Sequence, residues 1–221
     1  MSTAYDSFTF THGGRNFIAE LHTDDCGDAP WKRSDGHGPV TDWLRRDKQP
    51  GEWLLSEDGG SKRFYDAAAA LRMAKCDGWG IGEDQKAALI ARLSAPRILR
   101  RPKKGEKPSR TASGFLYLGM TYRADQIETV TIPGRDPAKP LTTGEIRAEA
   151  VRLDFEFLRG WCTDKWHYCG VAVRAVDADG EPMGDEFEHA LWGIESNDSD
   201  GIREVAEELA GQFPPQQPRS N

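Results

Sequence analysis

The sequence lacks the features of a membrane or secreted protein. Its longest apolar runs fall well short of the roughly 20 residues that a membrane-spanning helix needs. Met1 to Asp6 offers neither the basic nor the apolar segment of a secretion signal. Four cysteines without such a signal indicate free thiols rather than disulfides. We therefore expect a protein that acts in the cytoplasm and has no membrane partner.

Catalytic signatures are also missing. The chain contains no His-Glu-x-x-His, no Gly-x-Ser-x-Gly and no glycine-rich loop of the kind that cradles phosphate. His167 and Cys169 share one face of an expected strand, but two neighbours without a third orienting group do not make an activated nucleophile. These absences favour a non-catalytic protein.

What the chain does contain is enough apolar bulk for a core. Of its 221 residues, 38% are apolar, and seven Trp and nine Phe are among them. A chain of this length can bury about 70% of its unfolded surface in one domain. We predict a single domain over residues 1–213 and a disordered tail over residues 214–221.

The stretch from Thr142 to Phe213 is central to the predicted fold. Thr142 and Glu145 have the spacing of a capping box, which predicts the start of a long helix. Its apolar stripe contains Ile146, Ala150, Leu153, Phe157 and Trp161. The charged residues between them are expected to face water: Arg147, Glu149, Arg152, Asp154, Glu156 and Arg159.

Two strands and a second helix follow this long helix. Residues 166–176 and 186–195 alternate in polarity and flank the turn-forming residues 177–180. Residues 197–199 offer N-caps for a helix whose apolar positions run from Ile202 to Phe213. A hairpin and two helices of this kind predict a two-layer unit.

An N-terminal hairpin is expected to join the same sheet. Residues 8–11 and 17–21 alternate in polarity on either side of a Gly13-Gly14 turn. The complete pattern predicts an α+β fold, in which helices pack on a mostly antiparallel sheet as a two-layer sandwich.

The middle of the chain is predicted to add helices, strands and a basic inserted arm. Apolar spacing predicts helices over residues 63–76 and 83–93. At about 96–111 the composition changes, because seven Lys and Arg residues stand there among prolines. Strands are expected over residues 115–122 and 127–132.

The basic arm has two interpretations. A cluster of cations is suited to tracking a nucleic-acid backbone, so nucleic acid is an alternative partner. The same composition is typical of a solvated linker, and the segment has no interleaved aromatic residues for base stacking. The candidate nucleic-acid contacts are Arg100, Arg101, Lys103, Lys104 and Lys107.

Negative charge dominates the C-terminal part of the chain. From Asp177 to Glu208, twelve acidic residues stand against one base, Arg203. Such a surface can steer a basic protein partner or occupy a site meant for phosphate, as DNA-mimicking inhibitors do. It can also simply keep a fold in solution. The expected binding residues are Glu186, Glu188, Glu195, Asp198, Asp200, Glu204 and Glu208.

A divalent-metal site is the alternative that would make the protein a hydrolase. Carboxylates and imidazoles suit Mg, Mn or Zn, and a bound metal activates water against a phosphodiester. Asp35 and His37 would then be catalytic. The same residues lack a fixed spacing and are also compatible with a solvated loop. The candidate metal ligands are His22, Asp24, Asp25, Asp35 and His37.

A structural zinc site is a further alternative for the metal. It would use Cys162, His167 and Cys169, with Cys26 or Cys76 as the fourth ligand. Compact zinc sites usually contain two close cysteine pairs, and this chain has no Cys-x-x-Cys. The preferred interpretation therefore has no cofactor.

Six short stretches together carry a resemblance. They are Asp28 to Trp31, Asp35 to Val40, Ser61 to Asp66, Asp77 to Gly80, Trp166 to Val171 and Leu191 to Ser196. The set resembles a family of tailed-bacteriophage and prophage proteins with no assigned activity. The resemblance covers roughly residues 8–80 and 145–210 and does not include the basic middle. It implies a virus-encoded protein in bacterial cytoplasm.

These observations favour a phage accessory protein that binds a host or defence protein with a basic surface. The first alternative is a metal-dependent hydrolase acting on nucleic acid or nucleotide. The second alternative is a nucleic-acid-binding module that uses the basic arm.

Overall fold

The computed structural model describes residues 4–25, 27–33, 36–102, 115–117, 120–122, 127–183 and 189–214, with side chains except at 97–102 and 115–130. Its contacts divide the chain into two compact units. Residues 1–70 and 153–221 form the first unit, and residues 71–152 form the second. None of the described helices is long and apolar enough to cross a membrane.

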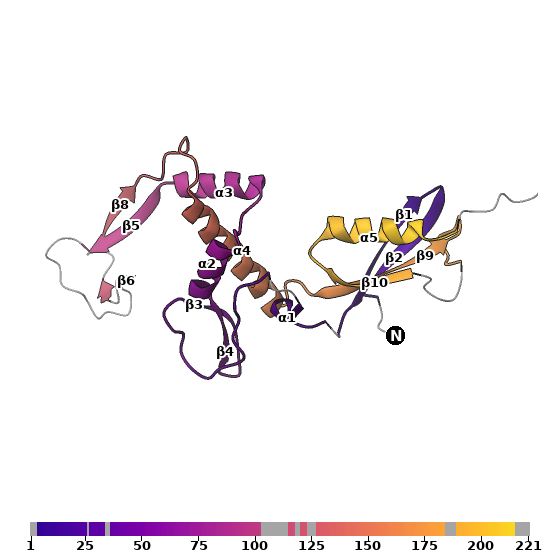
Figure 1. Ribbon diagram of the computed structural model, residues 1–221, viewed down its shortest axis with the longest axis horizontal. Coiled ribbons are helices and arrows are strands. Elements are labelled where there is room, and N and C mark those ends of the chain that lie inside the picture. Colours follow the sequence, from indigo (N-terminus) through magenta and orange to yellow (C-terminus); the bar gives the residue numbers. More distant parts are fainter. Residues whose placement is uncertain are drawn as a thin grey trace, which may run out of the picture. The chain divides into compact units, whose positions relative to one another are not determined.

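A four-stranded antiparallel sheet dominates the first unit (Figure 1). Its strands, in spatial order, are β1 (Asp6–His12), β2 (Arg15–Thr23), β9 (Tyr168–Val176) and β10 (His189–Glu195). The N-terminal hairpin joins the C-terminal one through β2 and β9, where Phe17 faces Ala175 and Leu21 faces Val171. This arrangement confirms the predicted antiparallel sheet.

Helix α5 (Ser199–Gly211) covers one face of this sheet (Figure 1). The Asp198 carboxylate caps the helix by accepting a hydrogen bond from Gly201 N–H at 3.0 Å. Helix and sheet share one buried cluster, which confirms the α+β fold. Its members are Phe17, Ala19, Leu21, Cys169, Val171, Val173, Ala175, Ile202, Ala206, Leu209, Ala210 and Phe213.

A second, two-stranded sheet replaces the start of an expected helix. Strands β3 (Glu52–Asp58) and β4 (Ser61–Asp66) pair across Gly59 and Gly60, whose φ angles are 53° and 77°. Two consecutive positive φ angles suit a tight hairpin turn, which glycine adopts without strain. The helix predicted over residues 63–76 is therefore wrong in its first turn. Helix α2 (Ala67–Cys76) begins only after Asp66, which accepts a hydrogen bond from Ala69 N–H at 2.8 Å.

The long helix α4 (Thr143–Cys162) starts as expected. Glu145 N–H donates to Thr142 Oγ1 at 3.2 Å, and Thr142 N–H donates to Glu145 Oε2 at 2.7 Å, so the capping box is confirmed. We expected this helix also to cover the four-stranded sheet. That expectation is wrong: all of α4 is described, and none of its residues belongs to the buried cluster of that sheet. Phe155 instead packs on Trp53 of β3 and Tyr65 of β4.

The second unit contains α3 (Glu83–Ser94) and the start of α4. Strand β5 (Arg97–Pro102) pairs along its length with β8 (Ile127–Ile132), so the basic arm begins as a strand. The single strand expected over residues 115–122 is two short paired strands, β6 (Phe115–Tyr117) and β7 (Met120–Tyr122).

One buried carboxylate in this unit also departs from the sequence prediction. Glu149, expected to face water, is 6% exposed and binds the guanidinium groups of Arg92 and Arg152. The Arg152 hydrogen bond holds the pKa of Glu149 below its usual value, because it favours the charged carboxylate.

Candidate functional site

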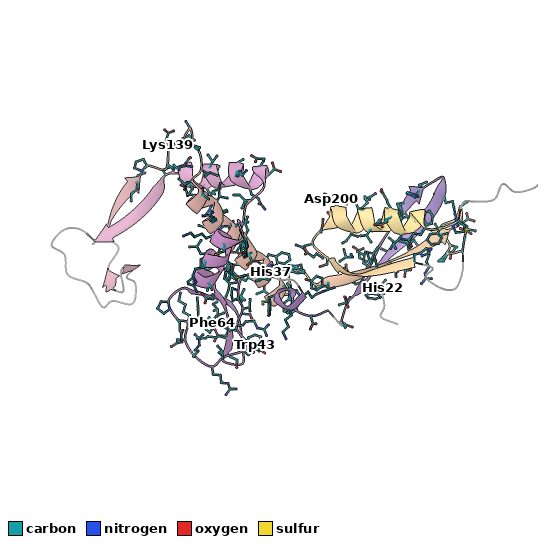
Figure 2. The ribbon with its side chains drawn as sticks, in the orientation of Figure 1. His22, His37, Trp43, Phe64, Lys139 and Asp200 are labelled. Atoms are coloured by element: carbon teal, nitrogen blue, oxygen red, sulfur yellow. The ribbon has the colours of Figure 1, made fainter. Side chains whose placement is uncertain are left out.

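The exposed side of α5 is lined by carboxylates. Asp200, Glu204 and Glu208, all expected binding residues, are exposed on it, and Asp198 is exposed at its N-cap. Figure 2 labels Asp200 in the first turn of the helix. Glu207, which we did not single out from the sequence, is exposed beside them. We call these five residues the acidic face.

Two charged residues border the acidic face. Arg203 is the cation of α5, and its guanidinium lies 5.5 Å from the centre of the Phe8 ring. Glu195, at the end of β10, is half-buried, and burial raises the pKa of its carboxyl, with Asp198 adding to the effect. Because it is half-buried, Glu195 presents less of its carboxylate to a partner than the exposed carboxylates of α5 do. The expected residues Glu186 and Glu188 lie outside the described part of the chain.

A buried carboxylate on α4 organises the second group of polar residues. Asp154 Oδ1 accepts a hydrogen bond from His37 Nδ1 at 2.6 Å. Its Oδ2 accepts from Gly38 N–H at 2.8 Å and from the Tyr65 hydroxyl at 2.7 Å. We call these four residues the Asp154 cluster. They join α4, β4 and the loop before β3.

Each member of the Asp154 cluster is held in place by packing. Burial, together with the Asp154 carboxylate, raises the pKa of Tyr65, so its hydroxyl remains a donor. The His37 ring stacks on Phe157, with ring centres 5.5 Å apart. A Cβ at Gly38 would lie 2.5 Å from the Tyr65 hydroxyl oxygen, so only glycine allows this close approach. The Asp154 cluster anchors the loop before β3, and Nδ1 of His37 is occupied by its hydrogen bond to Asp154.

Asp154 was expected to face water, and that prediction is wrong: its side chain is 9% exposed. A local signal for its burial is present in the sequence. Asp154 lies four residues after Ala150 and four before Leu158, and both of these are buried. Residues four apart share a helix face. A lone carboxylate on that face requires partners, which are supplied by distant residues.

The structure does not assemble the predicted metal ligands. His22 lies in β2, where its Nε2 is 3.5 Å from Glu20, whereas His37 binds Asp154. Figure 2 labels the two histidines in separate places, His22 in the four-stranded sheet and His37 beside α4. Over the described residues, no group of three or more His, Cys, Asp or Glu side chains could hold a metal ion. Asp35 lies outside those residues.

The candidate zinc ligands have other contacts. Cys169 is buried in the sheet core beside the Tyr5 hydroxyl, and His167 faces Ser196 Oγ at 3.5 Å. Burial raises the pKa of both Cys162 and Cys169, which disfavours the thiolate that a zinc site needs. Cys76 is exposed, and Cys26 lies outside the described residues.

The basic residues are placed only in part. Arg100 and Arg101 occupy β5, opposite Thr129 and Glu128 of β8. The other three expected contacts, Lys103, Lys104 and Lys107, lie outside the described part of the chain, so the structure does not test this set.

No protein-family model, curated protein or solved structure matches this chain. The resemblance to phage proteins therefore stays a prediction. The proposals below rest on the residues that the structure places.

Proposed function

We propose that this protein is a non-catalytic interaction protein that binds a positively charged protein partner through the acidic face of α5. The resemblance to phage proteins adds the expectation that this partner is a component of the bacterial host or of its defences. The basic surface with which a protein binds nucleic-acid phosphates is complementary in charge to the acidic face.

The observation that carries this proposal is the unfavourable charge arrangement along α5. Asp200, Glu204 and Glu208 succeed one another at four-residue spacing, where like charges destabilise a helix by about 0.2–0.5 kcal/mol per pair. The last turn has no basic residue, although the helix dipole favours a cation there. Arg203 offsets only part of this repulsion. A solubilising surface does not require carboxylates at these positions, whereas a binding surface for cations does.

Reversing two of these charges should make the protein more stable and at the same time abolish binding of its partner. We expect the double substitution Glu204→Lys with Glu208→Lys to raise the free energy of unfolding by about 0.5–1.5 kcal/mol. The substitution makes the pair with Asp200 attractive and places a cation in the last turn of α5, where the helix dipole favours one, whereas positions 204 and 208 still repel each other. The same variant should lose its partner. The measurements are urea unfolding and affinity capture from a nuclease-treated bacterial lysate, which excludes bridging by nucleic acid.

A matched control makes the same change in net charge at positions outside α5. Glu57→Lys with Glu156→Lys alters two exposed carboxylates that lie outside α5. This control should retain the partner. If both double variants recover the partner as well as the parent does, the acidic face only solubilises the fold.

A second candidate function follows from the pairing of β5 with β8. The basic segment starts in an antiparallel ribbon rather than as free linker, and such ribbons can enter the major groove of DNA. Replacing Lys103, Lys104 and Lys107 with alanine should weaken DNA or RNA binding and flatten its dependence on salt. Electrophoretic mobility at two salt concentrations measures this. If the unsubstituted protein shifts neither DNA nor RNA at low salt, the basic arm does not bind nucleic acid.

A further inference from the structure

A cleft in the first unit has no role in the function proposed above. It has a volume of about 410 Å³. It is lined by the loop after β2, by Trp43 in the segment before β3, by β3 and β4, and by the end of α4 together with the residues that lead into β9. No residue of α5, all of which is described, lines it. It is therefore distinct from the acidic face.

The aromatic walls of this cleft already bind a cation. The Arg63 guanidinium lies 4.6 Å from the centre of the Trp43 ring and 5.0 Å from that of Trp31. Trp31 in turn meets Trp161 edge to face at 5.3 Å. A cation over an indole face is attracted by the negative charge of the ring face, and arginine is the commonest such partner. Trp43 and Trp161 both line the cleft, and Trp43 remains 43% exposed.

The charged side chains of the cleft favour a further cation. Asp24, Asp25 and Asp164 line it together with the guanidinium of Arg63. A second guanidinium, that of Arg33, lies 4.3 Å from the ring centre of the lining residue Tyr168. Asp25 and Asp164 are exposed to solvent. This excess of carboxylates attracts cations and repels phosphate or carboxylate ligands.

The backbone that carries these carboxylates is held by hydrogen bonds. Asp24 N–H donates to Tyr168 O at 2.9 Å, which ties the loop after β2 to the start of β9. Asp164 follows the end of α4 with a φ of 55°, a left-handed conformation that aspartate and asparagine tolerate better than most residues. Asp164 N–H also donates to Trp161 O at 3.3 Å, so the backbone is held at both Asp24 and Asp164.

We propose that this cleft binds the guanidinium group of an arginine side chain presented by another protein. A planar guanidinium can stack on the part of the Trp43 ring that Arg63 leaves exposed. It can also donate hydrogen bonds to a carboxylate in a forked geometry, which an ammonium cannot reproduce. The site goes beyond the acidic face, since it recognises one side chain in a defined cavity rather than a charged surface.

A pair of small probes tests the proposal without knowledge of the natural partner. N-acetyl-arginine amide carries the guanidinium, and N-acetyl-citrulline amide has nearly the same shape without the charge. Titration followed by the indole N–H resonances should give a dissociation constant of about 1–10 mM for the arginine probe, the range expected for a ligand of this size. The citrulline probe should bind at least about tenfold more weakly.

Three variants locate the binding in this cleft. Trp43→Ala and Asp164→Asn should each weaken the arginine probe by about fivefold or more. Asn keeps the left-handed preference of position 164, so this variant retains the fold even if Trp43→Ala does not. Asp84→Asn, an exposed change on α3, serves as the control and should have no effect. Equal binding of the two probes, no binding of either, or undiminished binding by Asp164→Asn overturns the proposal.

Discussion

Replacing Asp154 with alanine should lower the free energy of unfolding by about 3–5 kcal/mol, the range seen when one partner of a buried polar network is removed. The carboxylate accepts hydrogen bonds from His37, Gly38 and Tyr65, and it is 9% exposed. Its loss leaves the Tyr65 hydroxyl and the Gly38 amide buried without an acceptor, and each such group costs about 1–3 kcal/mol.

Urea unfolding followed by tryptophan fluorescence measures this effect. Glu156→Ala removes an exposed carboxylate two residues along the same helix and should change the stability by less than about 0.5 kcal/mol. The amide resonance of Gly38 gives an independent readout, because it loses its hydrogen bond to a carboxylate. A loss below about 1 kcal/mol with an unchanged Gly38 resonance would mean that Asp154 does not anchor this loop.

Replacing Ala206 with aspartate should destabilise the protein by about 4 kcal/mol or more, because it places an unpaired charge in the core. Ala206 is fully buried between α5 and the four-stranded sheet. The side chains around it are apolar, so the new carboxylate finds no hydrogen-bond donor among the members of that cluster.

A matched variant introduces the same charge on the same helix without burying it. Ser199→Asp changes an exposed position in the first turn, where the helix dipole favours a negative charge. Thermal unfolding should show a large loss for Ala206→Asp and none for Ser199→Asp. Equal melting temperatures for both variants would show that α5 does not cover the sheet.

Local signals explain the parts of the fold that could be predicted from the sequence. The Thr142 and Glu145 capping box and the Asp198 N-cap each depend on residues within one helical turn. The glycine turns and alternating polarity around them likewise specify hairpins over short distances. The exposure of Asp200, Glu204 and Glu208 was predictable for the same reason, since it follows from the amphipathic pattern of α5 alone, and that pattern also contains the exposed Glu207 that we did not single out.

Errors arose where local signals competed. The alanines from Ala67 onward indicate a helix, and their periodicity extends back to Phe64, so the strand β4 was missed. The Gly59-Gly60 pair carried the opposing signal, because two positive φ angles favour a hairpin. Charge and proline content predict a linker or arm from about residue 96, whereas Ile98 and Leu99 lie in a paired strand.

Sequence patterns do not predict the candidate sites whose residues lie far apart in the chain. Asp154 meets Gly38 and Tyr65 across 116 and 89 positions of the chain. The cleft likewise gathers residues from the loop after β2, from β4 and from the end of α4. No spacing rule connects such residues, because their proximity results from packing of the whole unit.

The rate of association with the captured partner, measured against salt concentration, tests the role of the acidic face most directly. Charges at the rim of an interface act mainly on association, and salt screens them. We predict that the association rate constant of the parent falls at least about tenfold between about 20 mM and 500 mM NaCl. The rate constant of the Glu204→Lys, Glu208→Lys variant should be low throughout and nearly independent of salt. Identical rate constants and salt dependence for the two proteins would contradict binding through α5.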